Sequence, residues 1–148
     1  MIRELMSWEE CKNHLRTVDK DIQKANSILR MCKVRLRVLQ QIALDEETAS
    51  ILAEDYYEII KELLTALLLL KGLKSDNHEC LLSYFKKSYP DKEYELSILY
   101  ELKKARNSVS YEGLFLRKEY IERNKLEFLH IIKFLNSQSE EVINISPS

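Results

Sequence analysis

The sequence predicts an all-α protein that folds as an up-and-down bundle of about five helices, four of them long and one short. Only two glycines and two prolines occur in 148 residues, so few turns interrupt the chain. Several long stretches repeat their apolar residues at spacings of three and four, which is the period of one helix face. The chain is long enough to bury one core without further support.

The first helix is expected from about residue 7 to residue 43. Ser7 is followed three residues later by Glu10, which is the spacing of a capping box at a helix start. The apolar residues that follow have the heptad spacing of a long packed helix, either within the bundle or in a coiled coil with a second chain. They are Leu15, Val18, Ile22, Ala25, Leu29, Cys32, Leu36 and Leu39.

The second helix is expected over about 45–71. The acidic residues at 45–47 suit the positive end of a helix, and Gly72 fits the position just after its last turn. The stretch 63–70 is apolar nearly all round, so it must be covered on more than one side. In a domain this small we expect the bundle to cover one side and a second copy of the chain to cover the other. This predicts a homodimer.

A short third helix is expected to begin within 75–79 and to end before Tyr89 and Pro90. Asp76 and Glu79 have capping-box spacing, and the residue before a proline disfavours helix. His78 falls in the first turn of this helix. It either fixes the turn by a hydrogen bond or contributes to a phosphate or RNA site.

The fourth helix is expected over about 93–110, capped by Asp91 and stopped near Gly113. The fifth is expected over about 117–136. Together the helices predict one domain over residues 1–137. Residues 138–148 are rich in serine and asparagine and are expected to be a disordered tail.

Polar side chains gather near the end of the fourth helix. They fall beside an apolar stripe and are Arg106, Asn107, Ser110 and Tyr111. An arginine in this place either caps carbonyls or pairs with a carboxylate, or it binds phosphate. The first interpretation is the commoner one for an isolated arginine. The second is chemically suitable because the charged fork of donors matches phosphate oxygens, and the family resemblance described next favours it.

Two stretches, in this order and at this separation, carry a family resemblance. One is Tyr57–Leu82, which contains Leu70-Lys71-Gly72-Leu73-Lys74-Ser75 and then Asn77-His78-Glu79; the other is Arg106-Asn107 followed by Tyr111. They resemble the HEPN domains (higher eukaryotes and prokaryotes nucleotide-binding), whose signature is an Arg, usually a polar residue, and a His four to six positions later. The resemblance extends over about residues 5–137 and implies a HEPN-like fold.

The resemblance also implies a metal-independent ribonuclease site, formed where two protomers meet, with Arg106, Asn107 and Tyr111 in the catalytic positions. Arg106 would stabilise a phosphorane-like transition state, and a histidine would transfer protons. Tyr111 stands in the place of that histidine. A phenol has a pKa of about 10, so it is a poor general base at neutral pH. It can still donate a hydrogen bond or stack on a nucleobase. We therefore expect weak or absent nuclease activity, unless His78 or His130 lies alongside.

Three functions remain open. The first is a HEPN-like nucleotide- or RNA-binding protein that pairs with a minimal nucleotidyltransferase in a toxin–antitoxin-like system. The second is an active ribonuclease toxin with a diverged motif; in related systems the partner silences the toxin by nucleotidylating a tyrosine near the motif, which here would be Tyr111. The third is a helical interaction protein in which Arg106 is structural. No cofactor is expected.

Basic residues follow one another along the first helix. Arg30, Lys33 and Arg37 share a face, which is either solvated or a short rail for phosphates beside the Arg106 site. The formal net charge of the chain is −1, which argues against binding of polyanions through bulk charge.

The cysteines indicate neither a zinc ribbon nor a disulfide framework. Cys11, Cys32 and Cys80 lie far apart, are odd in number and form no CxxC pair. We therefore expect reduced thiols in a cytoplasm, and no metal. Acidic residues such as Glu54 and Glu58 are interpreted as a solvated face.

A membrane location is not expected either. Charged residues interrupt the start of the chain, so no signal peptide is expected. No apolar run approaches the roughly 20 residues that a membrane span needs. The sequence therefore predicts a cytoplasmic protein.

Overall fold

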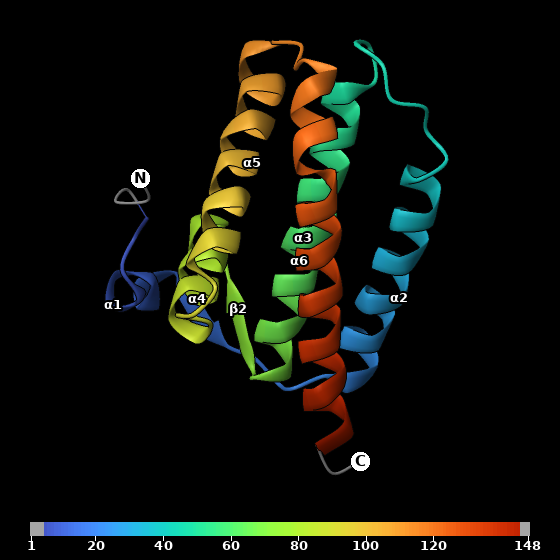
Figure 1. The fold of residues 1–148 in the computed structure, drawn as a ribbon. Coiled ribbons are helices and arrows are strands. Elements are labelled where there is room, and N and C mark those ends of the chain that lie inside the picture. Colours follow the sequence, from blue (N-terminus) through green and yellow to red (C-terminus); the bar gives the residue numbers. More distant parts are fainter. Residues whose placement is uncertain (1–4, 146–148) are drawn as a thin grey trace.

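A computed structural model describes residues 5–145, and these are mainly helical (Figure 1). Four long helices run up and down beside one another, and the shorter α4 (Glu79–Ser88) lies next to the lower part of the bundle. The long helices are α2 (Ile22–Leu39), α3 (Ala49–Leu70), α5 (Glu93–Glu112) and α6 (Lys118–Ile145). The all-α class is confirmed for the described residues, with small additions near the N-terminus.

Those additions replace the first part of the expected 7–43 helix. Only α1 (Trp8–Cys11) forms there, with the Ser7 hydroxyl accepting the Glu10 amide at 3.2 Å, as the capping box predicts. A 3₁₀ turn (Lys12–His14) and a strand, β1 (Leu15–Thr17), follow, and the long helix α2 begins only at Ile22. The expectation of one continuous helix was therefore wrong.

The physical reason is a strand partner far along the chain. β1 pairs antiparallel with β2 (Leu73–Ser75), with Leu15 opposite Ser75 and Thr17 opposite Leu73. These tertiary hydrogen bonds outweigh the helical period of residues 15–18, since helix propensity is a weak preference. The same period does describe α2, where Ala25, Leu29, Cys32 and Leu39 are buried.

Gly72 links this strand pair to the bundle. It follows the C-cap of α3 with a left-handed φ of +75°, so its predicted place after the helix end is confirmed. A Cβ atom here would lie 3.1 Å from the carbonyl oxygen of Val18. The Val18 amide in turn donates to the Gly72 carbonyl at 2.9 Å. Glycine thus permits both the turn and the close approach of the two segments.

The core is organised around α3, which packs against α2, α5 and α6. All of the side chains of residues 63–70 are buried apart from the half-buried Thr65. The chain's own elements supply this cover, because β2 and α4 also pack on α3. The expectation that a second copy must cover residues 63–70 was wrong, and this stretch offers no face to a partner.

The residues that cap the starts of α4 and α5 differ from those predicted by one position each. The Asn77 side chain, and not that of Asp76, accepts the Glu79 amide at 2.8 Å at the start of α4. Lys92, and not Asp91, is the N-cap of α5. Gly113 ends α5 with a left-handed φ of +67°, as expected.

The last helix is longer than its sequence suggests. α6 continues to Ile145, so most of the expected 138–148 tail is helical, and residues 146–148 lie outside the described residues. Ser139 is fully buried, and Val142 and Ile143 pack against the core. The polar composition concealed a buried stripe that continues the helix period. Within residues 5–145, no helix has the length and apolar character needed to cross a membrane.

Candidate functional site

The polar group at the end of α5 comes together around Arg106. The guanidinium carbon of Arg106 lies 5.7 Å from the ring centre of Tyr57 on α3 and 5.9 Å from that of Tyr111 on α5. Its Nη1 donates to the Asn107 side-chain oxygen over a long 3.4 Å. The structure therefore brings Arg106, Asn107 and Tyr111 together, and it adds Tyr57.

The two tyrosines differ in their access to solvent. Tyr57 is 2% exposed, and burial raises its pKa to about 12, so its phenol stays protonated. Tyr111 is 77% exposed. Arg106 thus has one ring in the protein wall and one ring facing solvent, and the outer ring is accessible to a ligand.

The guanidinium of Arg106 has no carboxylate within ion-pair distance in the part of the chain that the structure describes. The carboxylates on the neighbouring face of α3 have other partners: Glu54 accepts the Ser110 hydroxyl at 2.7 Å, and Glu58 pairs with Lys61 at 2.9 Å. Most of the donors of Arg106 are consequently available to an anion.

His78 belongs to the same electrostatic environment. Its pKa is lowered from the ordinary 6.5, first by burial and then by the positive charges of Lys61 and Arg106. The imidazole is therefore neutral at pH 7 and can accept a proton. His78 precedes the first residue of α4, so the start of that helix sets its position.

His130 does not join this group. It lines a separate hollow with Lys92, Glu95 and Phe134. Glu95 precedes Arg106 by 11 residues on α5, which is roughly 16 Å along a helix.

The cations of α2 also lie elsewhere. Arg30, Lys33 and Arg37 are exposed on α2, which lies on the opposite side of the bundle from α5 (Figure 1). Lys33 points toward α6, where its ammonium lies 3.6 Å from the Glu140 carboxylate. The expected phosphate rail beside Arg106 is therefore not formed.

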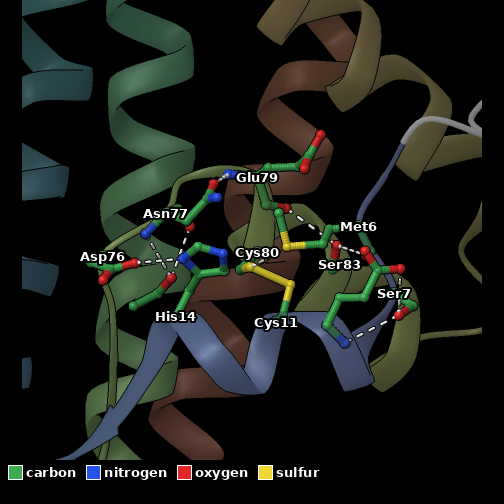
Figure 2. The surroundings of a disulfide bond; sticks show 11 residues. Met6, Ser7, Cys11, His14, Asp76, Asn77, Glu79, Cys80 and Ser83 are labelled. Atoms are coloured by element: carbon green, nitrogen blue, oxygen red, sulfur yellow. Dashed lines mark hydrogen bonds and ion pairs between the residues drawn. A yellow bond between two sulfur atoms is a disulfide. The ribbon is translucent and has the colours of Figure 1, made fainter.

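The largest departure from the sequence interpretation is a disulfide between Cys11 and Cys80 (Figure 2). Both residues are fully buried, whereas Cys32 is a free, buried thiol whose pKa burial raises to about 12. The expectation of three reduced thiols was wrong, because a separation of 69 residues leaves no local pattern to recognise.

Further contacts surround this disulfide and hold the N-terminal segment against α4. His14 Nδ1 lies 3.1 Å from the Asp76 carboxylate, and the Ser83 hydroxyl donates to the Met6 carbonyl (Figure 2). Cys80 lies two residues after His78, so the same contacts fix the start of α4 that carries His78. We refer to residues 5–17 with their disulfide as the N-terminal clasp.

Tyr57 and Lys61 are functional candidates that the sequence interpretation did not select. The available signal was a row of polar or aromatic residues along one side of a mainly apolar helix, at 54, 57, 58 and 61. Tyr57 alone looks like any other aromatic core residue, and only its proximity to Arg106 distinguishes it.

The arrangement can bind an anion and can exchange a proton. Arg106 and Lys61 supply positive charge, Tyr57 and Tyr111 supply rings, and His78 supplies a neutral imidazole. Among the described residues, no group of three or more histidine, cysteine or acidic side chains is placed to hold a metal ion. No family model, curated protein or solved structure matches the chain.

Proposed function

We propose that this chain is a HEPN-like nucleotide- or RNA-binding protein and that Arg106 holds a phosphate group of the ligand. One observation carries the proposal: the Arg106 guanidinium lies 5.7 Å and 5.9 Å from two tyrosine ring centres and has no carboxylate partner within ion-pair distance in residues 5–145. An arginine that served only the fold would be expected to pair with a carboxylate or to cap carbonyls. This one keeps its fork of donors open.

The neighbours of Arg106 suit a phosphate that carries a base. Lys61 contributes less than Arg106, because its ammonium pairs with Glu58 at 2.9 Å and lies 3.8 Å from the Glu62 carboxylate. Tyr111 is exposed and can stack on a nucleobase, which is a sequence-tolerant contact. The net charge of −1 means that affinity comes from this local geometry rather than from the whole surface.

Weak ribonuclease activity is the second candidate, and the influence of the Lys61 and Arg106 charges on His78 favours it. Cleavage at a phosphodiester needs a group that takes the proton of the 2′-hydroxyl, and a neutral imidazole does this near pH 7. His78 is neutral there because burial, Lys61 and Arg106 lower its pKa. Arg106 would then stabilise the charge that develops on the phosphate.

The partners belong to the same proposal. A HEPN-like protein of this kind acts as a homodimer and pairs with a minimal nucleotidyltransferase. The exposure of Tyr111 supports the view that its phenol oxygen is open to nucleotidylation. Transfer there would place a bulky anion next to Arg106 and occupy the proposed phosphate site.

The test is binding of a fluorescent single-stranded RNA of mixed sequence, followed by anisotropy for the wild type and Arg106→Gln. Loss of a charge-assisted, forked contact to phosphate is expected to weaken binding by about tenfold or more. Arg37→Gln is the matched control, because Arg37 is exposed on the far side of the bundle, and it should leave the affinity unchanged.

Two further measurements separate the alternatives. Incubation with RNA in a chelator tests for metal-independent cleavage, and Tyr111→His should raise it if the site lacks only a well-placed imidazole. If Arg106→Gln instead lowers the unfolding midpoint without changing RNA binding, Arg106 is structural and the protein is a helical interaction module.

A further inference from the structure

A second group of polar residues gathers around a groove between α2 and α6. α2 lies on the opposite side of the bundle from α5, the helix that carries Arg106 (Figure 1). The groove has a volume of about 360 Å³, which is within the size range of small-molecule sites. Each helix contributes residues at helical spacing, so one face of each helix lines it. These residues are Asn26, Leu29, Arg30 and Lys33 on α2, and Glu140, Ile143 and Asn144 on α6.

The charges of the groove are only partly compensated. Glu140 Oε1 lies 3.6 Å from the Lys33 ammonium and accepts the Asn136 amide at 2.7 Å. Arg30 has no ion-pair partner in the part of the chain that the structure describes. The groove therefore offers an open guanidinium, a second cation beside it and a carboxylate that is held in place from its own helix.

The remaining lining residues restrict the class of ligand. Asn26 and Asn144 present amides that both donate and accept hydrogen bonds, and Leu29 and Ile143 form the apolar part. A carboxylate such as Glu140 accepts hydrogen bonds from sugar hydroxyls. No aromatic side chain is among the described residues that line the groove, so it has no platform for stacking a nucleobase.

We propose that this groove is a binding site for a sugar phosphate, separate from the Arg106 site. Arg30, assisted by Lys33, binds the phosphate, and Glu140 with the two amides binds the hydroxyls. The carbon face of the sugar lies over Leu29 and Ile143. The site differs in chemistry from the Arg106 site, where two rings flank the cation.

The test is calorimetric titration with ribose 5-phosphate, and with ribose and inorganic phosphate as separate probes. Arg30→Gln is expected to weaken ribose 5-phosphate binding by about tenfold. Glu140→Gln is expected to weaken ribose 5-phosphate binding several-fold while leaving inorganic phosphate binding unchanged or stronger, since it removes a negative charge together with a hydroxyl acceptor. A merely structural role for Glu140 would not separate the two probes.

Matched controls locate the effect. Arg37→Gln changes an exposed arginine of the same helix outside the groove, and Arg106→Gln changes the other site; both should leave ribose 5-phosphate binding unchanged. Arg30→Lys keeps the charge but not the fork and should give an intermediate affinity. If Arg30→Gln lowers the melting temperature, Arg30→Lys replaces it as the variant that tests the role of Arg30.

Several results would overturn the proposal. They are the absence of ribose 5-phosphate binding at millimolar concentration, an equal loss in Arg37→Gln, and inorganic phosphate binding as tightly as the sugar phosphate. Tighter binding of adenosine monophosphate through Arg30 would make the groove a nucleotide site instead and would also overturn it.

Discussion

The two halves of α3 belong to one helix but have different surroundings. The second half, residues 63–70, is covered by the other long helices together with β2 and α4. The preceding part, residues 49–61, keeps a partly exposed row that includes Glu54, Glu58 and Lys61, and it faces Arg106 through Tyr57. The candidate site therefore lies beside the half-buried row of α3 and not beside its buried stretch 63–70.

The largest effect should come from the covered half. Leu67→Ala removes a side chain that is 1% exposed, and the lost burial and the cavity should lower the free energy of unfolding by about 2–5 kcal/mol. Urea unfolding measures this. Leu126→Ala is the matched control, because Leu126 is 75% exposed and should change the stability by less than about 0.5 kcal/mol. Equal effects of the two would contradict the difference in cover.

The N-terminal clasp should have the next largest effect. Replacing Cys11 and Cys80 together by serine opens a covalent loop with a separation of 69 residues, which should cost about 2–4 kcal/mol. A reductant should lower the urea midpoint of the wild type and leave that of the double variant unchanged. Three reactive thiols in the unfolded, unreduced wild type would show that the disulfide is absent.

The smallest effect on stability should come from His78, near the candidate site. The pKa of His78 in the folded protein lies below the 6.5 of the unfolded chain, so the unfolded chain binds more protons between the two values. The stability that depends on neutral His78 is therefore present above pH 6.5 and decreases as the pH falls through that value. His78→Gln should flatten this part of the stability–pH profile.

A titration of the imidazole protons by NMR sharpens the same comparison. A phosphate ligand bound at Arg106 should raise the pKa of His78, since a nearby anion favours the charged imidazole. The His130 ring resonances should not respond to the ligand, because His130 lies in a different hollow. A His78 pKa at or above 6.5 in the free protein would contradict the proposed environment.

The parts of the structure that sequence predicted are those specified by neighbouring residues. The end of α5 at Gly113 and the turn at Gly72 follow from helix period and glycine conformation, whereas the approach of Tyr111 to Arg106 does not. The capping-box spacing also predicted the N-cap at Ser7 correctly. The helix that begins there ends at Cys11, however, and is much shorter than predicted.

The parts that sequence did not predict depend on residues far apart in the chain. β1 forms because Leu73–Ser75 supplies hydrogen bonds, and Cys11 bonds to a cysteine 69 residues further along the chain. Tyr57 joined the site because α3 packs on α5. α6 extends further than predicted because Ser139 is buried against the rest of the bundle, and the polar composition of this stretch does not reveal that burial. In each case tertiary contact outweighed local preference.

The disulfide also divides the protein by connectivity. Residues 11–80 form a covalent ring that contains all of α2 and α3, while α5 and α6 lie outside it. The connection between α2 and α3 is largely exposed and lies within the ring. A protease that cuts this connection once would therefore leave a single nicked molecule, and the two pieces would separate on a denaturing gel only after reduction.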